Sequence, residues 1–230
     1  MTERLTIDIF SDVMCPWCII GYKQLQKALA TLDGEIEAEV RWRPFELNPD
    51  MPPEGEDSAE HVMRKYGRSE EQAAAGRSQM AAIAEKAGYS FAYTGEEPEP
   101  RARMRNSFLA HKLLAHALRV AGPDVQTALK LALFDAHFQQ RRDIGSREVL
   151  LDLAGSVGLD RAAAEAALAD PKLSEFVRSE EAQAWDMNIS GVPAMVVNGR
   201  FLVPGAQEPQ VYVDLLRRVV ARERVGATTA

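Results

Sequence analysis

The stretch DVMCPWCIIGYKQL, residues 12–25, holds both cysteines of this 230-residue chain, Cys15 and Cys18. Two residues separate them, and the sequence contains no other thiol. A pair at this spacing fits half of a metal site, a structural disulfide or a redox-active centre. The segments on either side of the stretch discriminate among these interpretations and also indicate the fold.

The stretch lies between two segments in which apolar and polar residues alternate. Before it, LTIDIF (5–10) places Leu5, Ile7 and Ile9 on one face, and after it IEAEVRWRPF (36–45) alternates in the same way. Alternation of this kind predicts β-strands. Apolar residues recur at helical spacing from about residue 16 to 32. A strand, a helix and a strand in this order predict a parallel α/β unit.

The middle of the chain is different, because its patterns predict helices and no strand. A linker rich in Pro, Gly and acids, NPDMPPEGEDS (48–58), comes first. The predicted helices cover about 58–66, 69–88, 103–121, 123–141, 146–157, 160–169 and 171–188. After them, AMVV (194–197), Asn198-Gly199 and RFLV (200–203) predict a hairpin, since Asn-Gly accepts a type I′ turn. A last helix is predicted from near Pro209.

Without most of the middle helices, the order of elements is β-α-β followed by α-β-β-α, which is a thioredoxin-like order. We therefore predict an α/β protein, a thioredoxin-like fold with a large inserted all-helical domain. Residues 1–50 and 171–230 are the predicted parts of the thioredoxin-like domain, and residues 51–170 are the predicted insertion.

A metal site explains the cysteine pair poorly. A structural zinc site needs about four ligands, and the pair supplies only half of them. All histidines lie in the predicted helical block, and there is no second C-x-x-C motif. A disulfide that closes so short a loop constrains the unfolded chain little. The sequence therefore favours neither a metal ion nor a structural staple.

The composition limits the partners. Lys and Arg total 27 and Asp and Glu total 34, a formal net charge of −7, which argues against nucleic acid. The opening residues MTERLTIDIF lack the features of a signal peptide. No apolar run approaches the roughly 18 residues that cross a bilayer. We expect a cytoplasmic protein without a membrane partner. Structural disulfides are rare in the cytoplasm.

The redox interpretation accounts for the position of the pair. Cys15 follows a predicted strand, and Pro16 suits the first position of a helix, where its missing N–H costs nothing. Cys15 is then the N-cap, where the helix dipole favours a thiolate. Cys18 lies one turn further along and can close a disulfide. We predict Cys15 to be the exposed nucleophile and Cys18 the more buried resolving thiol.

Several segments resemble the DsbA family of thioredoxin-fold oxidoreductases, and most closely its FrnE-like subgroup. They are SDVMCPWCIIGYKQL (11–25), PFELNP (44–49), GVPAMVVNGRFLVPGAQ (191–207), RNSFLAHKLL (105–114) and LFDAHFQQRRDIG (133–145). The resemblance covers about residues 5–220. It implies disulfide exchange with protein or peptide substrates, no bound cofactor, and glutathione as a candidate co-substrate.

The resemblance also implies residues around the cysteines. Val192–Pro193 is expected to be a cis peptide that faces the pair, and the backbone of Val192 is expected to pair with the substrate like a short strand. Pro16 and Trp17 lie between the cysteines. Both are expected to contact the substrate, because an exposed aromatic side chain beside a reactive thiol is typical of a contact site.

Other polar residues have two interpretations each. Asn106 and His111 match a helical motif of the subgroup, which implies contact with substrate or glutathione; the alternative is that they only pack. Asp8 lies on the first predicted strand. Similar oxidoreductases often hold an acid beneath the pair that accepts the proton of the resolving thiol, and the alternative is an ordinary strand residue. Family members often have Tyr where this chain has His137.

Two other functions stay open. Some relatives with this architecture are glutathione-dependent isomerases or transferases of the 2-hydroxychromene-2-carboxylate type, but they typically carry Ser at the position of Cys15. The other alternative is a non-catalytic binding protein whose cysteines are an idle switch. The intact pair favours a protein-disulfide oxidoreductase.

Overall fold

The computed structural model describes residues 2–228, with side chains through residue 225. The strands are β1 (Glu3–Ser11), β2 (Ile36–Pro44), β3 (Glu56–Asp57), β4 (Arg103–Met104), β5 (Ala194–Val197) and β6 (Phe201–Pro204). The helices are α1 (Pro16–Thr31), α2 (Ser58–Tyr66), α3 (Glu70–Ala87), α4 (Phe108–Phe134), α5 (Arg147–Ser156), α6 (Arg161–Ala169), α7 (Pro171–Asp186) and α8 (Pro209–Thr228), and the π-helical turn η1 (Asp135–Gln139) continues α4.

The central sheet has the strand order β2-β1-β5-β6. β1 and β2 are parallel, as the intervening helix α1 requires. β5 is antiparallel to both β1 and β6. Asn198 and Gly199 both have positive φ, 48° and 65°, so they form the predicted hairpin turn. The predicted thioredoxin-like order of elements is confirmed.

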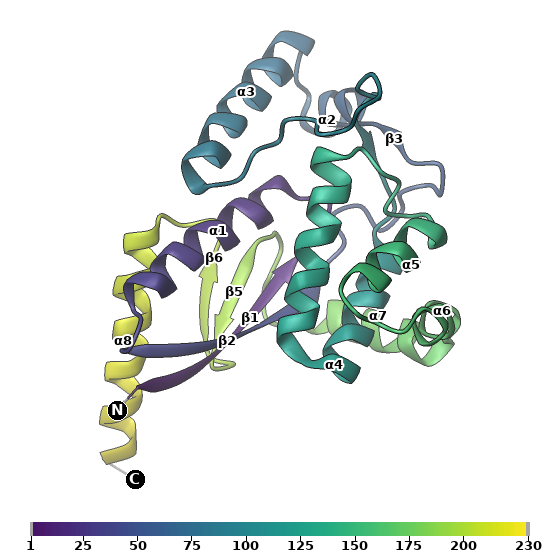
Figure 1. The fold of residues 1–230 in the computed structure, drawn as a ribbon. Helices are drawn as coiled ribbons and strands as arrows, with labels where there is room; N and C mark the ends of the chain where they lie inside the picture. The colour runs from purple at the N-terminus through teal and green to yellow at the C-terminus, as the bar shows by residue number, and fades with distance from the viewer. Residues whose placement is uncertain (1, 229–230) are drawn as a thin grey trace.

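The sheet has helices on both faces. Residues Ile7 and Ile9 of β1 point to the face covered by α1 and α8, where they share a buried core with Cys15 and Cys18. Figure 1 shows α1 and α8 together beside the sheet, with α4 at its other side next to β2. Phe10 points to the opposite face and packs with residues at the end of α7. The cysteine pair is therefore part of the core beneath α1.

The middle helices build a second core. α4, α5 and α6 pack on one another through buried apolar side chains, which include Leu113, Leu133 and Leu150. The buried side chains of Val13 and Met14, from the loop between β1 and α1, enter the same core. The loop that leads into Cys15 is thus held by the inserted helices, although it belongs to the sheet half of the chain.

Helix α4 also covers the edge of the sheet. The side chain of Gln126 accepts a hydrogen bond of 2.9 Å from the backbone N–H of Trp42 and donates one of 2.8 Å to the Trp42 carbonyl. Both backbone groups of an edge strand are thereby satisfied, which protects the edge from pairing with other chains. The same contact fixes α4 against β2, close to the start of α1.

One expectation about the insertion was wrong in detail. It is not all-helical, because β3 and β4 form a small antiparallel sheet; two residues are too few for an alternating pattern to show in the sequence. The predicted division between the helices 103–121 and 123–141 is confirmed, because α4 has a non-helical break at Gly122 (φ 85°, ψ −178°) before Pro123, although the first helix begins at Phe108. The division into residues 1–50, 51–170 and 171–230 stays a prediction.

Candidate active site

The cysteine pair opens helix α1 as predicted. Cys15 is the N-cap residue with an extended backbone (φ −93°, ψ 113°), and Pro16 is the first helical residue. The backbone N–H of Cys18 donates to the Cys15 carbonyl at 3.1 Å. Both cysteines are reduced and buried, with 4% of Cys15 and 0% of Cys18 exposed. Cys15 is therefore not the exposed residue that its N-cap position suggested.

The segment before β5 accounts for this burial. The Val192–Pro193 peptide is cis, as expected, and the Val192 carbonyl oxygen lies 3.6 Å from the Sγ of Cys15. The Pro193 ring packs on α1: its Cγ is 3.2 Å from the position that a Cβ on Gly21 would occupy. The Pro193 carbonyl accepts a 2.8 Å hydrogen bond from Gly205. This segment therefore covers Cys15 and leaves a partly buried Val192 backbone beside the sulfur.

Asp12 holds the loop in front of the cysteines. Its Oδ1 accepts a 3.1 Å hydrogen bond from the Met14 N–H, its Oδ2 accepts one of 2.7 Å from the Leu47 N–H, and its carbonyl accepts from the Cys15 N–H. The Nε2 of His111 lies 3.7 Å from Oδ1. Burial alone raises the pKa of Asp12, but His111 and these N–H groups lower it below its usual range. A buried carboxylate, more than a simple turn residue, thus fixes this loop.

A buried lysine that the sequence patterns did not indicate lies beneath the pair. Lys130 of α4 is 0% exposed, and its Nζ is 3.4 Å from the Ser11 carbonyl oxygen. Burial lowers its pKa to about 8, and the negative charges of Cys18, Asp12 and Cys15 oppose this shift. The part of the helix around Lys130 reaches the core of the sheet because α4 runs along β2.

The electrostatics of the two thiols differ from the prediction. The hydrogen bond to Cys18 and burial raise the pKa of Cys15 well above its usual range. Burial also acts to raise the pKa of Cys18, but the hydrogen bond from Cys15 and the charge of Lys130 outweigh it and lower that pKa. The helix dipole at the N-cap favours a charge on Cys15, whereas the buried Lys130 acts on the second thiol.

Asp8 does not lie beneath the pair. Successive residues of a strand point to opposite faces, and Ile7 and Ile9 take the face of the cysteines. Asp8 instead lies 4.0 Å from Arg43, which also pairs with Glu180 of α7. Burial raises the pKa of Asp8, but the groups around it belong to the other face of the sheet. Of the two interpretations of Asp8, the structure therefore favours the ordinary strand residue.

The remaining predicted residues have different positions. Trp17 is 41% exposed and Pro16 is half-buried, so both border the entrance to Cys15. Asn106 holds two backbone segments together: its side chain donates to the Met51 carbonyl at 3.1 Å and accepts from the Phe108 N–H at 3.0 Å. Asn106 therefore caps the start of α4. His137 is buried, and burial lowers its pKa to about 4, so it is neutral at physiological pH.

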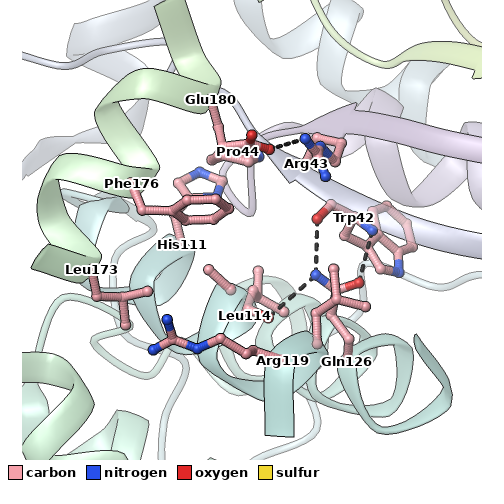
Figure 2. Close-up of a pocket in the computed structure, with 12 residues that line it drawn as sticks. Trp42, Arg43, Pro44, His111, Leu114, Arg119, Gln126, Leu173, Phe176 and Glu180 are labelled. Atoms are coloured by element: carbon pink, nitrogen blue, oxygen red, sulfur yellow. Dashed lines mark hydrogen bonds and ion pairs between the residues drawn. The ribbon is translucent and has the colours of Figure 1, made fainter. Parts of the chain in front are cut away.

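His111 lies between Asp12 and a separate cleft. The cleft, with a volume of about 220 Å³, is formed by α4, α7 and the end of β2. Figure 2 shows His111 beside the ring of Phe176, with Leu114 and Arg119 along the α4 side. The Nε2 of His111 is buried and makes no hydrogen bond within residues 2–228. His111 thus reaches the active-site loop through Asp12, while its ring borders a cleft that the cysteines do not line.

Neither a metal-binding cluster nor a membrane-spanning helix is found in residues 2–228. Within residues 2–228, no group of three or more His, Cys, Asp or Glu side chains is arranged to hold a metal ion. In the same part of the chain, no helix is both long enough and apolar enough to cross a membrane.

The sequence and the fold of this chain are similar to those of known proteins. Residues 6–217 match the model of the DSBA-like thioredoxin domain. The chain is 31% identical to a probable DsbA oxidoreductase from Streptomyces coelicolor, with a TM-score of 0.82 over 94% of this chain and 90% of that one. It is 27% identical to the protein YwbO of Bacillus subtilis (strain 168), over 90% of this chain and 92% of YwbO.

A more distant structure shares the fold alone. The cytosolic disulfide reductase DsbM from Pseudomonas aeruginosa, solved with glutathione, is 18% identical, with a TM-score of 0.61 over 94% of this chain and 99% of that chain.

Proposed function

Because this chain belongs to the family of DSBA-like thioredoxin domains, we propose that it is a thiol–disulfide oxidoreductase that exchanges disulfides with protein or peptide substrates through Cys15 and Cys18. One observation carries the proposal: the pair opens helix α1, and the Val192 carbonyl lies 3.6 Å from the Cys15 sulfur. A sulfur beside a backbone group that precedes a strand suits an extended peptide that contains a disulfide or a thiol.

The proposed reaction passes through a mixed disulfide. In the direction that reduces a substrate, Cys15 loses its proton and attacks one substrate sulfur, and the other substrate sulfur leaves as a thiolate that takes up a proton. Cys18 then loses its proton and attacks the sulfur of Cys15, the bond to the substrate breaks, and the second substrate sulfur leaves as a thiolate that takes up a proton. Two electrons pass from the dithiol to the substrate, and the reverse sequence oxidises a substrate dithiol.

The finer assignments are part of the same proposal. The matching cysteine, Gly-Val-Pro and helical segments support membership of the FrnE-like subgroup. The low proportion of cysteine, with both thiols in one C-x-x-C motif, supports work in the cytoplasm, where thiols are kept reduced. Glutathione is the proposed small co-substrate, because it is the thiol that would re-reduce or cap Cys15 there. No bound cofactor is needed for these steps.

The test is reduction of a peptide disulfide by the reduced protein, with release of peptide thiols followed over time. Wild type should release two peptide thiols for each protein oxidised, and Cys15→Ser should release none. Lack of release by the wild-type protein would reject the exchange function in favour of a binding protein. Glutathione-dependent turnover of a hydroxychromene carboxylate, retained in Cys18→Ser, would instead support the isomerase alternative.

A further inference from the structure

We propose that the cleft between α4 and α7 binds a small amphiphilic molecule with a carboxylate at one end, an aliphatic body and a hydroxyl group at the other end. The carboxylate binds Arg119, and the hydroxyl group donates to the imidazole of His111. Both residues line the cleft. Neither cysteine lines it, so the inference does not depend on the exchange function.

The size and the walls of the cleft suit an aliphatic ligand. Its volume is about 220 Å³. A cavity of about 150 Å³ holds benzene, and pockets for drug-sized ligands begin at about 300 Å³, so a single short chain fits between these limits. Phe176 is 46% exposed, and a ligand that covers it buries apolar surface. The aliphatic side chains of the walls are Leu114, Ala115 and Leu118 of α4 and Leu173 of α7.

The α4 side of the cleft is a single stripe of the helix. It begins at His111 and continues through Leu114, Ala115 and Leu118, at the spacings of three and four residues that share one helix face. Arg119 follows, about 12 Å along the axis from His111 at a rise of 1.5 Å per residue. Figure 2 shows Leu114 between the two polar side chains. An extended chain on this stripe therefore meets aliphatic groups in its middle and a polar group at each end.

Arg119 carries the positive charge that a ligand has to neutralise. Two arginines and one glutamate line the cleft, and Arg43 and Glu180 pair with each other. Arg119 is exposed and makes no hydrogen bond or ion pair with the part of the chain that the structure describes. The cleft is therefore locally positive, although the chain has a formal net charge of −7. A guanidinium binds a carboxylate through two parallel hydrogen bonds, which selects an acid over a neutral group.

His111 supplies a hydrogen-bond acceptor at the other end. Its side chain is 2% exposed, and neither ring nitrogen makes a hydrogen bond within residues 2–228. Because Nε2 lies 3.7 Å from the Asp12 carboxylate, a neutral imidazole keeps its proton there and leaves Nδ1 with a lone pair. A hydroxyl group of the ligand satisfies this acceptor, which is costly to leave unpaired. A second carboxylate is disfavoured, since it would meet the charge of Asp12 behind the ring.

The direct test is a calorimetric titration with 8-hydroxyoctanoate, which has the three parts in the proposed order. One molecule should bind to each protein chain. The uncharged 8-hydroxyoctanamide should bind at least about tenfold more weakly, because the charge-assisted hydrogen bonds to Arg119 are lost. Octanoate, which lacks the hydroxyl group, should bind several-fold more weakly. Absence of saturable binding of 8-hydroxyoctanoate would overturn the inference, and equal affinity for octanoate would overturn the role of His111.

Arg119→Gln tests the charged end of the cleft. It should weaken the binding of 8-hydroxyoctanoate at least about tenfold and leave that of 8-hydroxyoctanamide unchanged. Arg77→Gln is the matched control, because Arg77 is an exposed arginine of α3 that does not line the cleft. Its affinities should equal those of the wild type. An Arg119→Gln protein with wild-type affinity, or equal losses in both variants, would reject Arg119 as the carboxylate site.

Ala115→Phe tests the place of binding. Ala115 is half-buried in the middle of the α4 stripe, so the larger side chain should fill the cleft and abolish binding of all three probes. Binding at wild-type strength would show that the probes lie elsewhere. If Ala115→Phe does not fold, Phe176→Ser serves instead, because it removes an exposed wall and should weaken binding several-fold. A wild-type dimer that Ala115→Phe converts to a monomer would assign the cleft to a second copy of the chain and overturn the inference.

Discussion

The sulfur of Cys15 lies 3.6 Å from the carbonyl oxygen of Val192, although 177 positions separate the two residues in the chain. Val192 precedes β5, and the first β5 residue that pairs with β1 is Ala194. The Val192 backbone is therefore not used by the sheet. The Cys15 sulfur and the unpaired Val192 backbone therefore lie side by side. Their closeness depends on how tightly the Val192–Pro193 segment packs on α1.

Gly21→Ala tests this packing. A Cβ at residue 21 would lie 3.2 Å from the Cγ of Pro193 and 3.3 Å from the Cβ of Ala206, closer than ordinary contact. We expect the Pro193 segment to be pushed from the helix, which should cost about 1–2 kcal/mol of unfolding free energy and slow disulfide exchange several-fold. Denaturant unfolding and the exchange rate measure the two effects.

Gly155→Ala is the matched control. Gly155 lies in α5, and no atom beyond its own surroundings in the helix lies within 4 Å of the added Cβ. Alanine is the better helix former by up to about 1 kcal/mol, so this variant should be equally or more stable and should exchange disulfides at the wild-type rate. Equal behaviour of the two glycine variants would show that Gly21 is not a close contact.

Trp17→Ala tests recognition of the substrate. Trp17 is 41% exposed and lies two residues after Cys15, so its loss should leave the unfolding free energy nearly unchanged. We expect the KM for a peptide disulfide to rise by a factor that corresponds to about 1–2 kcal/mol, with a smaller effect on glutathione. Trp185→Ala removes another exposed tryptophan, which packs on Phe45 in the core on the opposite face of the sheet from the cysteines, and should not alter the KM.

The local signals in the sequence were sufficient for the position of the pair. Pro16 after Cys15 predicted the start of α1, and the strand patterns on either side predicted a parallel unit, because each signal depends on neighbours in the chain. The same alternation also predicts the orientation of the Asp8 side chain. If Ile7 and Ile9 face α1, then Asp8 points to the opposite face of the sheet. The strand pattern therefore favoured the ordinary strand residue over the proton acceptor that the family resemblance implied.

Lys130 carried no such signal. In the sequence it is one of two lysines on its helix, and it becomes buried only because α4 lies against β2. The pKa values of Cys15 and Cys18 depend on this contact between distant segments. Asp12 is similar, since its second backbone partner, Leu47, lies 35 residues further along the chain. Long-range packing, which periodicity does not contain, decides the electrostatics of the site.

Glu46 should make stability depend on pH. Burial and the charge of Glu181 raise its pKa to about 7, although it pairs with Arg178. The unfolded chain releases this proton near pH 4.5 and the folded protein only near pH 7, so the unfolding free energy should fall as pH rises between these values. Glu46→Gln should remove that decline and be more stable than wild type at pH 8 by on the order of 1–2 kcal/mol.

Denaturant unfolding at pH 5 and at pH 8 measures the effect. Glu37→Gln is the control, because Glu37 pairs with Arg4 on the surface and both side chains are largely exposed; its stability should follow the wild type at both pH values. A Glu46→Gln protein that loses stability relative to wild type at pH 8 would contradict the raised pKa.

The roles of the two thiols can be separated because access and charge point to different cysteines. The surroundings of Cys18 lower its pKa, but this thiol is 0% exposed, whereas Cys15 retains 4% exposure at the entrance. An incoming disulfide has to reach the sulfur, so we expect access to decide. With oxidised glutathione, Cys18→Ser should accumulate one glutathione on Cys15, because no second thiol resolves the mixed disulfide, and Cys15→Ser should accumulate none. Mass spectrometry measures both. An adduct confined to Cys18 in Cys15→Ser would reverse the assignment and make charge the deciding factor, and undiminished exchange in both variants would remove the pair from the mechanism.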